Sequence, residues 1–179
     1  DQILKFDGGT WDFERLYVPS FLGPGGHSAR QLNWVRDRLR QVFDVEQKDI
    51  ATKRIYVSRR DAATRRLVNE DAILPLLEKK GFEIIAPGEL SLGEQVAKFS
   101  DASVIVGVAG SGLTNFAFAN PGCTLIEFQP DDYINLAYWY MANAVGHKYW
   151  FEIGKTLNED QDFSIEPARV EAALIGVLG

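Results

Sequence analysis

The stretch VIVGVAGSGLTN, residues 104–115, decides the fold that this sequence predicts. It opens with an apolar, β-branched run that is typical of a buried strand, and its glycines then mark a tight turn. The residues after the turn are typical of the start of a helix. A strand that passes through a short turn into a helix is the repeating unit of a parallel sheet covered by helices.

The same alternation of short apolar runs and longer amphipathic stretches continues on both sides. We expect strands at 54–58, 83–86, 103–107, 124–128 and 149–153, and helices at 69–80, 91–100, 112–119, 133–145 and 167–178. Before them, residues 15–18 are typical of a further strand, and residues 27–43 carry apolar side chains at helical spacing. The sequence therefore predicts one α/β, Rossmann-like domain over residues 1–179, with a mostly parallel sheet and helices on both faces.

Two of the expected helices have recognisable starts. Ser91 followed by Glu94 fits a capping box, and Asn69 precedes two acids where the helix dipole favours negative charge. Pro75 lies inside the helix that Asn69 opens. That helix is therefore expected either to kink at the proline or to begin nearer to it.

The composition argues against nucleic acid or anionic lipid as the main ligand. The chain has 179 residues, 46% of them hydrophobic, and a formal net charge of -6. No apolar run approaches the roughly 18 residues of a membrane span, and the first residues lack a signal-peptide layout. The single cysteine, Cys123, and the lack of an Asn-x-Ser/Thr acceptor favour a reducing cytoplasm, with peripheral membrane attachment as an alternative in a bacterium. Because the chain begins with Asp1, we expect a longer parent polypeptide.

The glycine-rich turn predicts a phosphate site. Its glycines let a ligand approach the backbone, and the first amides of the helix that follows point toward an anion. In an open parallel sheet such a turn lies at the carboxyl ends of the strands, where ligands bind. The candidate phosphate-binding residues are Gly110, Ser111, Gly112, Leu113, Thr114 and Asn115. A second interpretation stays open, in which the glycines only allow the helix to pack closely on the strand.

Side chains from neighbouring strand ends extend this predicted site. Arg59 follows the first strand and can pair with a diphosphate through its planar fork of donors, whereas Arg60 and Arg65 are expected to be solvated. Glu127, near the end of the fourth strand, can accept hydrogen bonds from the ribose or another part of a donor, or can cap the following turn. Glu94 is a further donor-binding candidate, although the capping box already accounts for it.

Other polar and aromatic residues have structural interpretations. Asp131 and Asp132 follow a proline in what we expect to be a solvated turn, so no metal site is predicted. Cys123 is interpreted as an inert turn residue and His147 as structural. For the aromatic residues near 138–140 and 149–150, core packing is the ordinary expectation.

Two segments resemble a known family. YVSRRDAATRRLVNE (56–70) and GFEIIAPGELSLGEQVAKFSDASVIVGVAGSGLTNFAFANPGCTLIEF (81–128) are similar to the C-terminal half of glycosyltransferase family 61. Its members include bacterial capsular-polysaccharide transferases and eukaryotic xylosyl- and N-acetylglucosaminyltransferases. The resemblance implies a two-domain GT-B architecture, in which this chain is the donor-binding domain and an N-terminal acceptor domain lies outside it. It also implies inverting transfer from a nucleotide sugar, of the uridine diphosphate type, to a glycan or other hydroxyl acceptor, with no separate cofactor.

One position departs from the family's pattern. The family's turn commonly has histidine where this chain has Ala109, so whatever that imidazole does for the diphosphate cannot happen in the same way here. The matched segments offer no catalytic base, and His27, in the loop GPGGHSAR, is only a weak candidate. We expect metal-independent stabilisation of the leaving group by Arg59 and the helix amides. The resemblance supports as site residues Arg59, Glu94, Gly110, Ser111, Gly112, Leu113, Thr114, Asn115 and Glu127.

Two other functions stay open at this point. An NAD-type oxidoreductase is suggested by GVAGSG, but the spacing is not GxGxxG, and the turn follows several βα units where a dinucleotide fingerprint normally opens the first. A non-catalytic module that binds sugar nucleotides or carbohydrates is favoured by Ala109 and by the missing upstream half.

Overall fold

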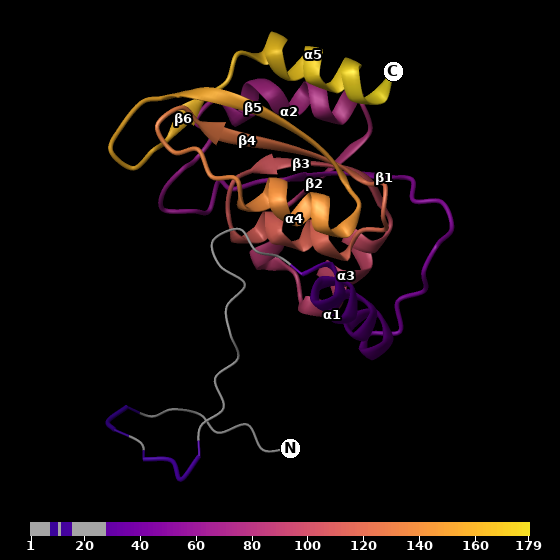
Figure 1. Cartoon of the computed structure of the whole chain (residues 1–179). Helices are drawn as coiled ribbons and strands as arrows, with labels where there is room; N and C mark the ends of the chain where they lie inside the picture. The colour runs from indigo at the N-terminus through magenta and orange to yellow at the C-terminus, as the bar shows by residue number, and fades with distance from the viewer. Residues whose placement is uncertain (1–7, 11, 16–27) are drawn as a thin grey trace.

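A computed structural model of the chain describes residues 8–10, 12–15 and 28–179. The described residues form one six-stranded sheet in the order β2-β1-β3-β4-β5-β6 (Figure 1). The strands are β1 (Lys53–Val57), β2 (Phe82–Ile85), β3 (Ala102–Val108), β4 (Thr124–Pro130), β5 (Lys148–Thr156) and β6 (Phe163–Ser164). Strands β1 to β5 are parallel, and β6 pairs antiparallel with the end of β5. The mostly parallel sheet predicted from the sequence is confirmed.

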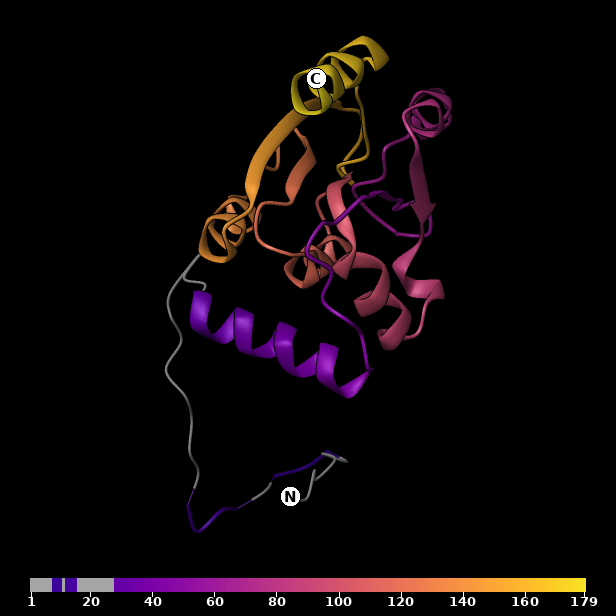
Figure 2. The ribbon, with the colours of Figure 1, turned by 90° about the vertical axis from the view of Figure 1, so that its right-hand side faces the viewer.

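Helices cover both faces of this sheet. The α-helices are α1 (Ala29–Val42), α2 (Glu70–Lys79), α3 (Leu92–Ser100), α4 (Ala137–Val145) and α5 (Pro167–Leu178), and the 3₁₀ helices are η1 (Pro87–Glu89) and η2 (Ser111–Phe118). Helices α2 and α5 lie over one face, while α1, α3 and α4 lie on the other side (Figures 1 and 2). No helix in the described part of the chain is both long and apolar enough to cross a membrane.

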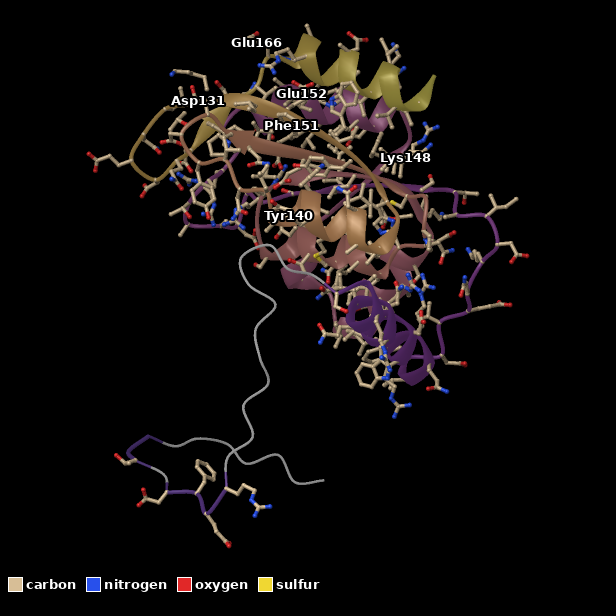
Figure 3. All side chains as sticks on the ribbon, viewed as in Figure 1. Asp131, Tyr140, Lys148, Phe151, Glu152 and Glu166 are labelled. Carbon is tan, nitrogen blue, oxygen red and sulfur yellow. The ribbon has the colours of Figure 1, made fainter. Side chains whose placement is uncertain are left out.

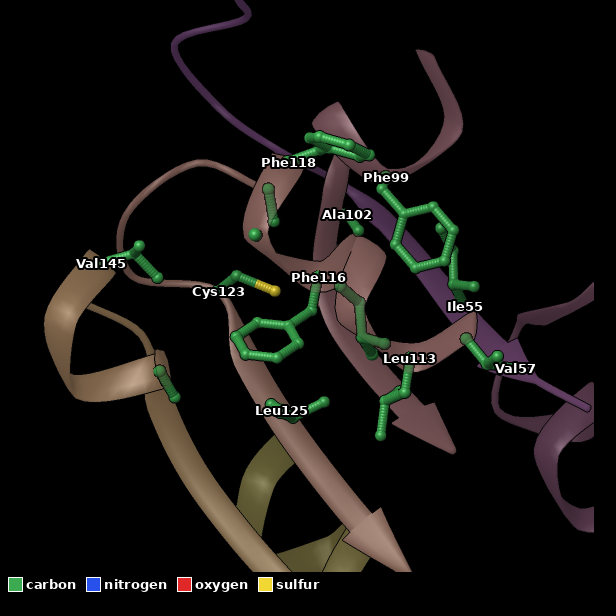
Figure 4. Close-up of a cluster of buried hydrophobic side chains, with 14 of the residues drawn as sticks. Ile55, Val57, Phe99, Ala102, Leu113, Phe116, Phe118, Cys123, Leu125 and Val145 are labelled. Atoms are coloured by element: carbon green, nitrogen blue, oxygen red, sulfur yellow. The ribbon is translucent and has the colours of Figure 1, made fainter. Parts of the chain in front are cut away.

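Each face of the sheet carries its own apolar core. Neighbouring residues of a strand point to opposite faces, so Leu125 joins the core under α3, η2 and α4, while Ile126 joins the one under α2 and α5. Figure 4 shows the first core, where Phe99 and Phe116 pack among aliphatic side chains. A sheet buried on both faces requires continuous apolar strands, which explains the run at the start of residues 104–115.

The helix predicted after the glycine-rich turn is confirmed, and it is a 3₁₀ helix, η2, over Ser111–Phe118. Leu113 and Phe116 are three residues apart in this helix, and both have 0% exposure. In a 3₁₀ helix, residues three apart lie on one face, so this geometry turns both side chains into the core.

Other elements agree only in part with the sequence-based expectations. Helix α4 begins at Ala137 and not at residue 133, and the Asn135 side chain, just before it, accepts a hydrogen bond of 2.8 Å from the Ala137 amide. Strand β6 was not predicted, since two residues are too few to show an alternating pattern. Helix α2 continues through Pro75, so a start nearer to the proline is wrong. The expected strand at 15–18 lies largely outside the described residues.

The order of the strands creates a crevice at one edge of the sheet. The chain passes from β1 outward to β2, and then returns across β1 to form β3. At such a reversal, the two loops leaving the carboxyl ends of adjacent strands diverge, and ligands of open parallel sheets bind between them. Asp131 follows the carboxyl end of β4, at the opposite end of the sheet from Lys148, which begins β5 (Figure 3).

Candidate functional site

A pocket of about 500 Å³ lies between the carboxyl ends of β1 and β3, where the strand order reverses. Residues that follow β1 form one wall, and the glycine-rich turn with the start of η2 forms another. Its lining residues are Val57, Ser58, Arg59, Asp61, Ala62, Pro87, Gly88, Gln95, Val108, Gly110, Ser111, Gly112, Leu113 and Asn115. The structure therefore brings Arg59 together with most of the turn residues that the sequence singled out.

Arg59 packs directly against the turn. Its guanidinium group occupies the space where Gly110 would carry a side chain, so any larger residue at that position would overlap it. Nε of Arg59 donates a hydrogen bond of 3.2 Å to the backbone oxygen of Thr64, which fixes the course of the side chain. The absence of a side chain at Gly110 thus places a cation beside the start of η2.

The electrostatic environment of Arg59 favours an anion. Partial burial and the neighbouring guanidinium of Arg65 lower the pKa of Arg59, although an arginine remains protonated at neutral pH. The carboxylate of Asp61 opposes this effect. Two guanidinium groups that repel each other across one turn would both be stabilised by a bound phosphate.

The backbone of the turn supplies further donors. The first amides of a helix have no acceptor within it, so the N–H groups of Ser111 and Gly112 are available to an anion. The hydroxyl group of Tyr138 donates a 2.6 Å hydrogen bond to the Gly110 carbonyl and steadies the turn from the side of α4. Leu113, which we expected among the ligand contacts, is completely buried and belongs mainly to the core.

Two of the glycines also have packing roles. A side-chain carbon at Gly107 would lie 2.9 Å from carbons of both Val57 and Leu113, so the strand can take only glycine there without displacing its neighbours. At Gly112 the nearest atom would be a ring carbon of Pro87, at 3.2 Å. The packing interpretation of the turn is therefore correct for Gly107, which lies inside β3 and not at the pocket.

Asn115 and Thr114 have different neighbours. The amide of Asn115 donates a 2.7 Å hydrogen bond to the side chain of Gln95 on α3, and both residues line the pocket. Thr114 is exposed and its hydroxyl lies 3.1 Å from that of Tyr138, outside the pocket lining. Asn115 can therefore orient the pocket wall, whereas Thr114 supports the far side of the turn.

Glu127 is completely buried in the middle of β4. Its Oε2 accepts a 2.6 Å hydrogen bond from the hydroxyl of Tyr149, while Oε1 has no partner among the described residues. Burial raises the pKa of Glu127 to about 7, against the lowering effect of the hydrogen bond from Tyr149. The residue lines a second, smaller pocket and does not reach the larger one.

The remaining predicted site residues lie elsewhere. Glu94 is exposed, and its carboxylate accepts hydrogen bonds from the amide and hydroxyl of Ser91, which confirms the capping box and lowers the pKa of Glu94. His27 lies outside the described residues. Arg60 is exposed as expected and pairs with Glu70.

Arg65 does not have the solvated position that we expected. It is half-buried, and its guanidinium carbon lies 4.8 Å from the centre of the Tyr133 ring. Its backbone adopts a φ of 54°, an unusual value for a residue with a side chain. Neither feature has a signal in the sequence, because both depend on where the loop after β1 meets the segment between β4 and α4.

The structural interpretations of His147 and Cys123 agree with their surroundings. His147 is buried, its Nε2 lies 3.0 Å from the backbone oxygen of Phe116, and burial lowers its pKa to about 4. Cys123 points into the apolar core (Figure 4), and burial raises the pKa of its thiol to about 12. Both groups are therefore uncharged at neutral pH.

Acidic and aromatic residues beyond the pockets are only partly as expected. Asp131 accepts a 2.9 Å hydrogen bond from the Thr156 amide and pairs with Lys155, which ties the turn to β5. Among the described residues, no three His, Cys, Asp or Glu side chains gather where they could hold a metal ion. Trp139, Tyr140 and Trp150 are 42%, 44% and 45% exposed, so the expectation of core packing is wrong for these three residues.

Several pocket residues had no signal in the sequence. Asp61, Pro87, Gly88 and Gln95 line the larger pocket, but they lie on loops and on a helix whose positions follow only from the folded sheet. Tyr138 could have been singled out, since it belongs to an aromatic run, yet such runs are common in cores.

The fold and this site define a class of protein. A mostly parallel α/β sheet with a cationic, glycine-lined pocket at its reversal point is the arrangement of domains that bind phosphorylated or nucleotide ligands. The family described as Glycosyltransferase 61 matches residues 11–126. This match covers more than half of the chain, and the chain belongs to glycosyltransferase family 61.

One curated relative is similar over a shorter segment. Alpha-1,3-arabinosyltransferase XAT3 of Oryza sativa subsp. japonica is 34% identical over 71 residues, which cover 37% of this chain. The matched segment spans 12% of that relative's length. The likeness to this enzyme therefore concerns one part of a much longer protein.

Proposed function

We propose that this chain is the donor-binding part of a glycosyltransferase that transfers a sugar from a nucleoside diphosphate to a hydroxyl group of a glycan or another acceptor. The family and the relative's activity support transfer of a sugar. In this proposal the chain forms the C-terminal domain of a two-domain GT-B enzyme, and a separate N-terminal domain binds the acceptor. Uridine diphosphate is the proposed nucleotide.

The single observation that carries this proposal is the pocket between β1 and β3. Its lining includes Arg59, which supplies a guanidinium group, and Ser111 and Gly112, whose backbone N–H groups have no acceptor within the helix. A diphosphate has several acceptor oxygens and negative charge, so it matches a site built from cations and N–H donors. A volume of about 500 Å³ suits a ligand the size of a nucleoside diphosphate.

The same groups have a role in the reaction that we propose. In inverting transfer, the acceptor oxygen forms a bond to the anomeric carbon while the bond from that carbon to the phosphate oxygen breaks. Negative charge then develops on the departing diphosphate. In our proposal, Arg59 and the turn amides stabilise this charge without a metal ion, and the presence of Arg59, Ser111 and Gly112 in the lining of one pocket supports this role.

A general base has no assigned residue in this proposal. Asp61 is a carboxylate on the wall of the larger pocket, and its charge acts on Arg59. In our proposal the base belongs to the acceptor-binding domain. Ala109 favours a second candidate function, a module that binds nucleotide sugars without catalysis, because it lacks the imidazole common at this position in the family.

Calorimetric titration of the chain with UDP and with NAD tests the proposal. We expect UDP to bind and NAD not to bind. Arg59→Ala should weaken UDP binding by about 1–3 kcal/mol, because a charge-assisted hydrogen bond is lost. Arg60→Ala is the matched control, since it removes an adjacent, exposed arginine outside the larger pocket and should leave UDP affinity unchanged.

The contrary results are equally specific. Binding of NAD without UDP would reject the transferase assignment and favour an oxidoreductase. Equal UDP affinity for Arg59→Ala and the wild type would remove Arg59 from the site. A transfer assay with UDP-arabinose or UDP-xylose and the full-length enzyme separates a catalyst from a binding module, because only a catalyst releases UDP in step with acceptor glycosylation.

A further inference from the structure

A second pocket of about 210 Å³ lies beside the first. The two pockets share Gly110 and Ser111, so the glycine-rich turn separates them. The second pocket is enclosed by the loop after β1, the carboxyl ends of β3 and β4, and the start of α4. Its characteristic side chains are Arg65, Ala109, Glu127, Tyr133 and Tyr138.

The wall of this second pocket contains an unpaired hydrogen-bond acceptor. Glu127 is 0% exposed, and its Oε1 has no partner among the described residues, while Oε2 is held by Tyr149. Buried carboxylate oxygens are nearly always hydrogen-bonded, because an unpaired one loses its hydration without compensation. Oε1 is therefore positioned to accept a hydrogen bond from a ligand in the pocket.

The same pocket also contains an unpaired donor. Nε of Arg65 is buried and has no acceptor among the described residues, and the guanidinium lies over the ring of Tyr133. The ligand must therefore donate to Glu127 and accept from Arg65. Hydroxyl groups do both, whereas a phosphate can only accept and would be repelled by an ionised Glu127.

We infer that this second pocket binds the sugar ring of the donor, with a ring hydroxyl donating to Glu127 and the nucleoside and diphosphate lying on the Arg59 side of the turn. This inference rests on the proposed function. A volume of about 210 Å³ is below the range of pockets that hold whole nucleoside-sized ligands, but one sugar ring is smaller. Ala109 is a small residue on the wall and leaves this space open.

The position of the turn explains how one ligand occupies both pockets. The diphosphate of a nucleotide sugar lies between the nucleoside and the sugar. A diphosphate held by the amides of Ser111 and Gly112 would extend in one direction into the larger pocket and in the other into the smaller. The bond between the sugar and the phosphate would then break next to Arg59 and the turn amides, which stabilise the departing diphosphate.

The inference is tested by calorimetry with UDP and a panel of UDP-arabinose, UDP-xylose, UDP-glucose and UDP-N-acetylglucosamine. For Glu127→Gln, UDP affinity should stay within about twofold of the wild type. The affinity for the preferred UDP-sugar relative to UDP should fall by about tenfold or more, because a hydrogen bond to a charged group is lost. Ala109→Leu, which fills the pocket, should reduce the same ratio.

Glu152→Gln is the matched control, since Glu152 lies on the adjacent strand and pairs with Arg169 away from both pockets. Thermal unfolding of every variant checks that the fold is retained. An equal loss for UDP and UDP-sugars in Glu127→Gln would place ribose in the pocket and overturn the inference. An unchanged ratio of UDP-sugar affinity to UDP affinity in both Glu127→Gln and Ala109→Leu would also overturn the inference. In either case, normal UDP binding by the wild type would still support the proposed function. Failure of the wild type to bind UDP would overturn both.

Discussion

The contact between Arg59 and Gly110 links the loop after β1 to the turn after β3. The guanidinium fills the space that a side chain at Gly110 would occupy, so this position needs glycine to make room for Arg59. The φ of Gly110 is 172°, an extended value open to any residue, and so its requirement for glycine is spatial and not conformational. A substitution of Gly110 should therefore displace the Arg59 side chain without changing the backbone conformation of the turn.

We predict that Gly110→Ala displaces the Arg59 guanidinium and weakens UDP binding about tenfold, with little change in stability because the end of an arginine side chain can move. Calorimetry and thermal unfolding measure the two effects. Gly176→Ala is the control: this glycine lies in α5 with open space around it, so alanine should stabilise the chain by up to about 1 kcal/mol. Tight UDP binding by Gly110→Ala would contradict the prediction.

Among the secondary-structure elements, the start of α2 is held in an unexpected way. The sequence suggests that the Asn69 side chain caps this helix, but the side chain makes no capping hydrogen bond. Its side chain instead donates a 2.8 Å hydrogen bond to the backbone oxygen of Ile165 and accepts one of 3.2 Å from the amide of the same residue. The amide group therefore pairs like a peptide unit and joins α2 to the segment that leads into α5.

We predict that Asn69→Ala lowers the free energy of unfolding by about 1–3 kcal/mol, because the backbone groups of the buried Ile165 lose both partners. Urea denaturation gives this difference. Ser91→Ala, which removes an ordinary exposed cap from α3, should cost only about 1 kcal/mol. A smaller loss for Asn69→Ala than for Ser91→Ala would show that the link between α2 and α5 contributes little.

The stability of the whole molecule should depend on pH through two buried groups with opposite effects. Glu127 has a pKa raised to about 7 from 4.5, so its contribution to stability is complete below about pH 4.5 and is lost as the pH rises through 7. His147 has a pKa lowered to about 4 from 6.5, so its contribution is complete above about pH 6.5 and is lost as the pH falls toward 4. Their effects overlap and partly cancel in the wild type.

Glu127→Gln separates these two effects. The variant cannot ionise, so the wild type should become progressively less stable relative to it between about pH 5 and pH 8, by at most about 3 kcal/mol. Urea unfolding at several pH values measures the difference. Parallel pH profiles for the wild type and Glu127→Gln would contradict the raised pKa.

The sequence by itself was enough to predict the α/β class, the alternation of parallel strands with helices, the capping box at Ser91 and a glycine-rich turn that lines a pocket. These features depend on apolar periodicity and turn chemistry within a few residues, which are local properties. Arg59 could be singled out because it directly follows a strand, and the family could be recognised from segments that contain it.

The two pockets followed only from the folded chain. Arg65 and Glu127 are far apart in sequence, and they line one pocket because parallel strands bring their carboxyl ends to a single edge of the sheet. Packing also determines that Oε1 of Glu127 has no partner among the described residues and that η2 is a 3₁₀ helix. Both features depend on which side chains meet in the interior. Local periodicity indicates which residues are buried, but packing determines their neighbours.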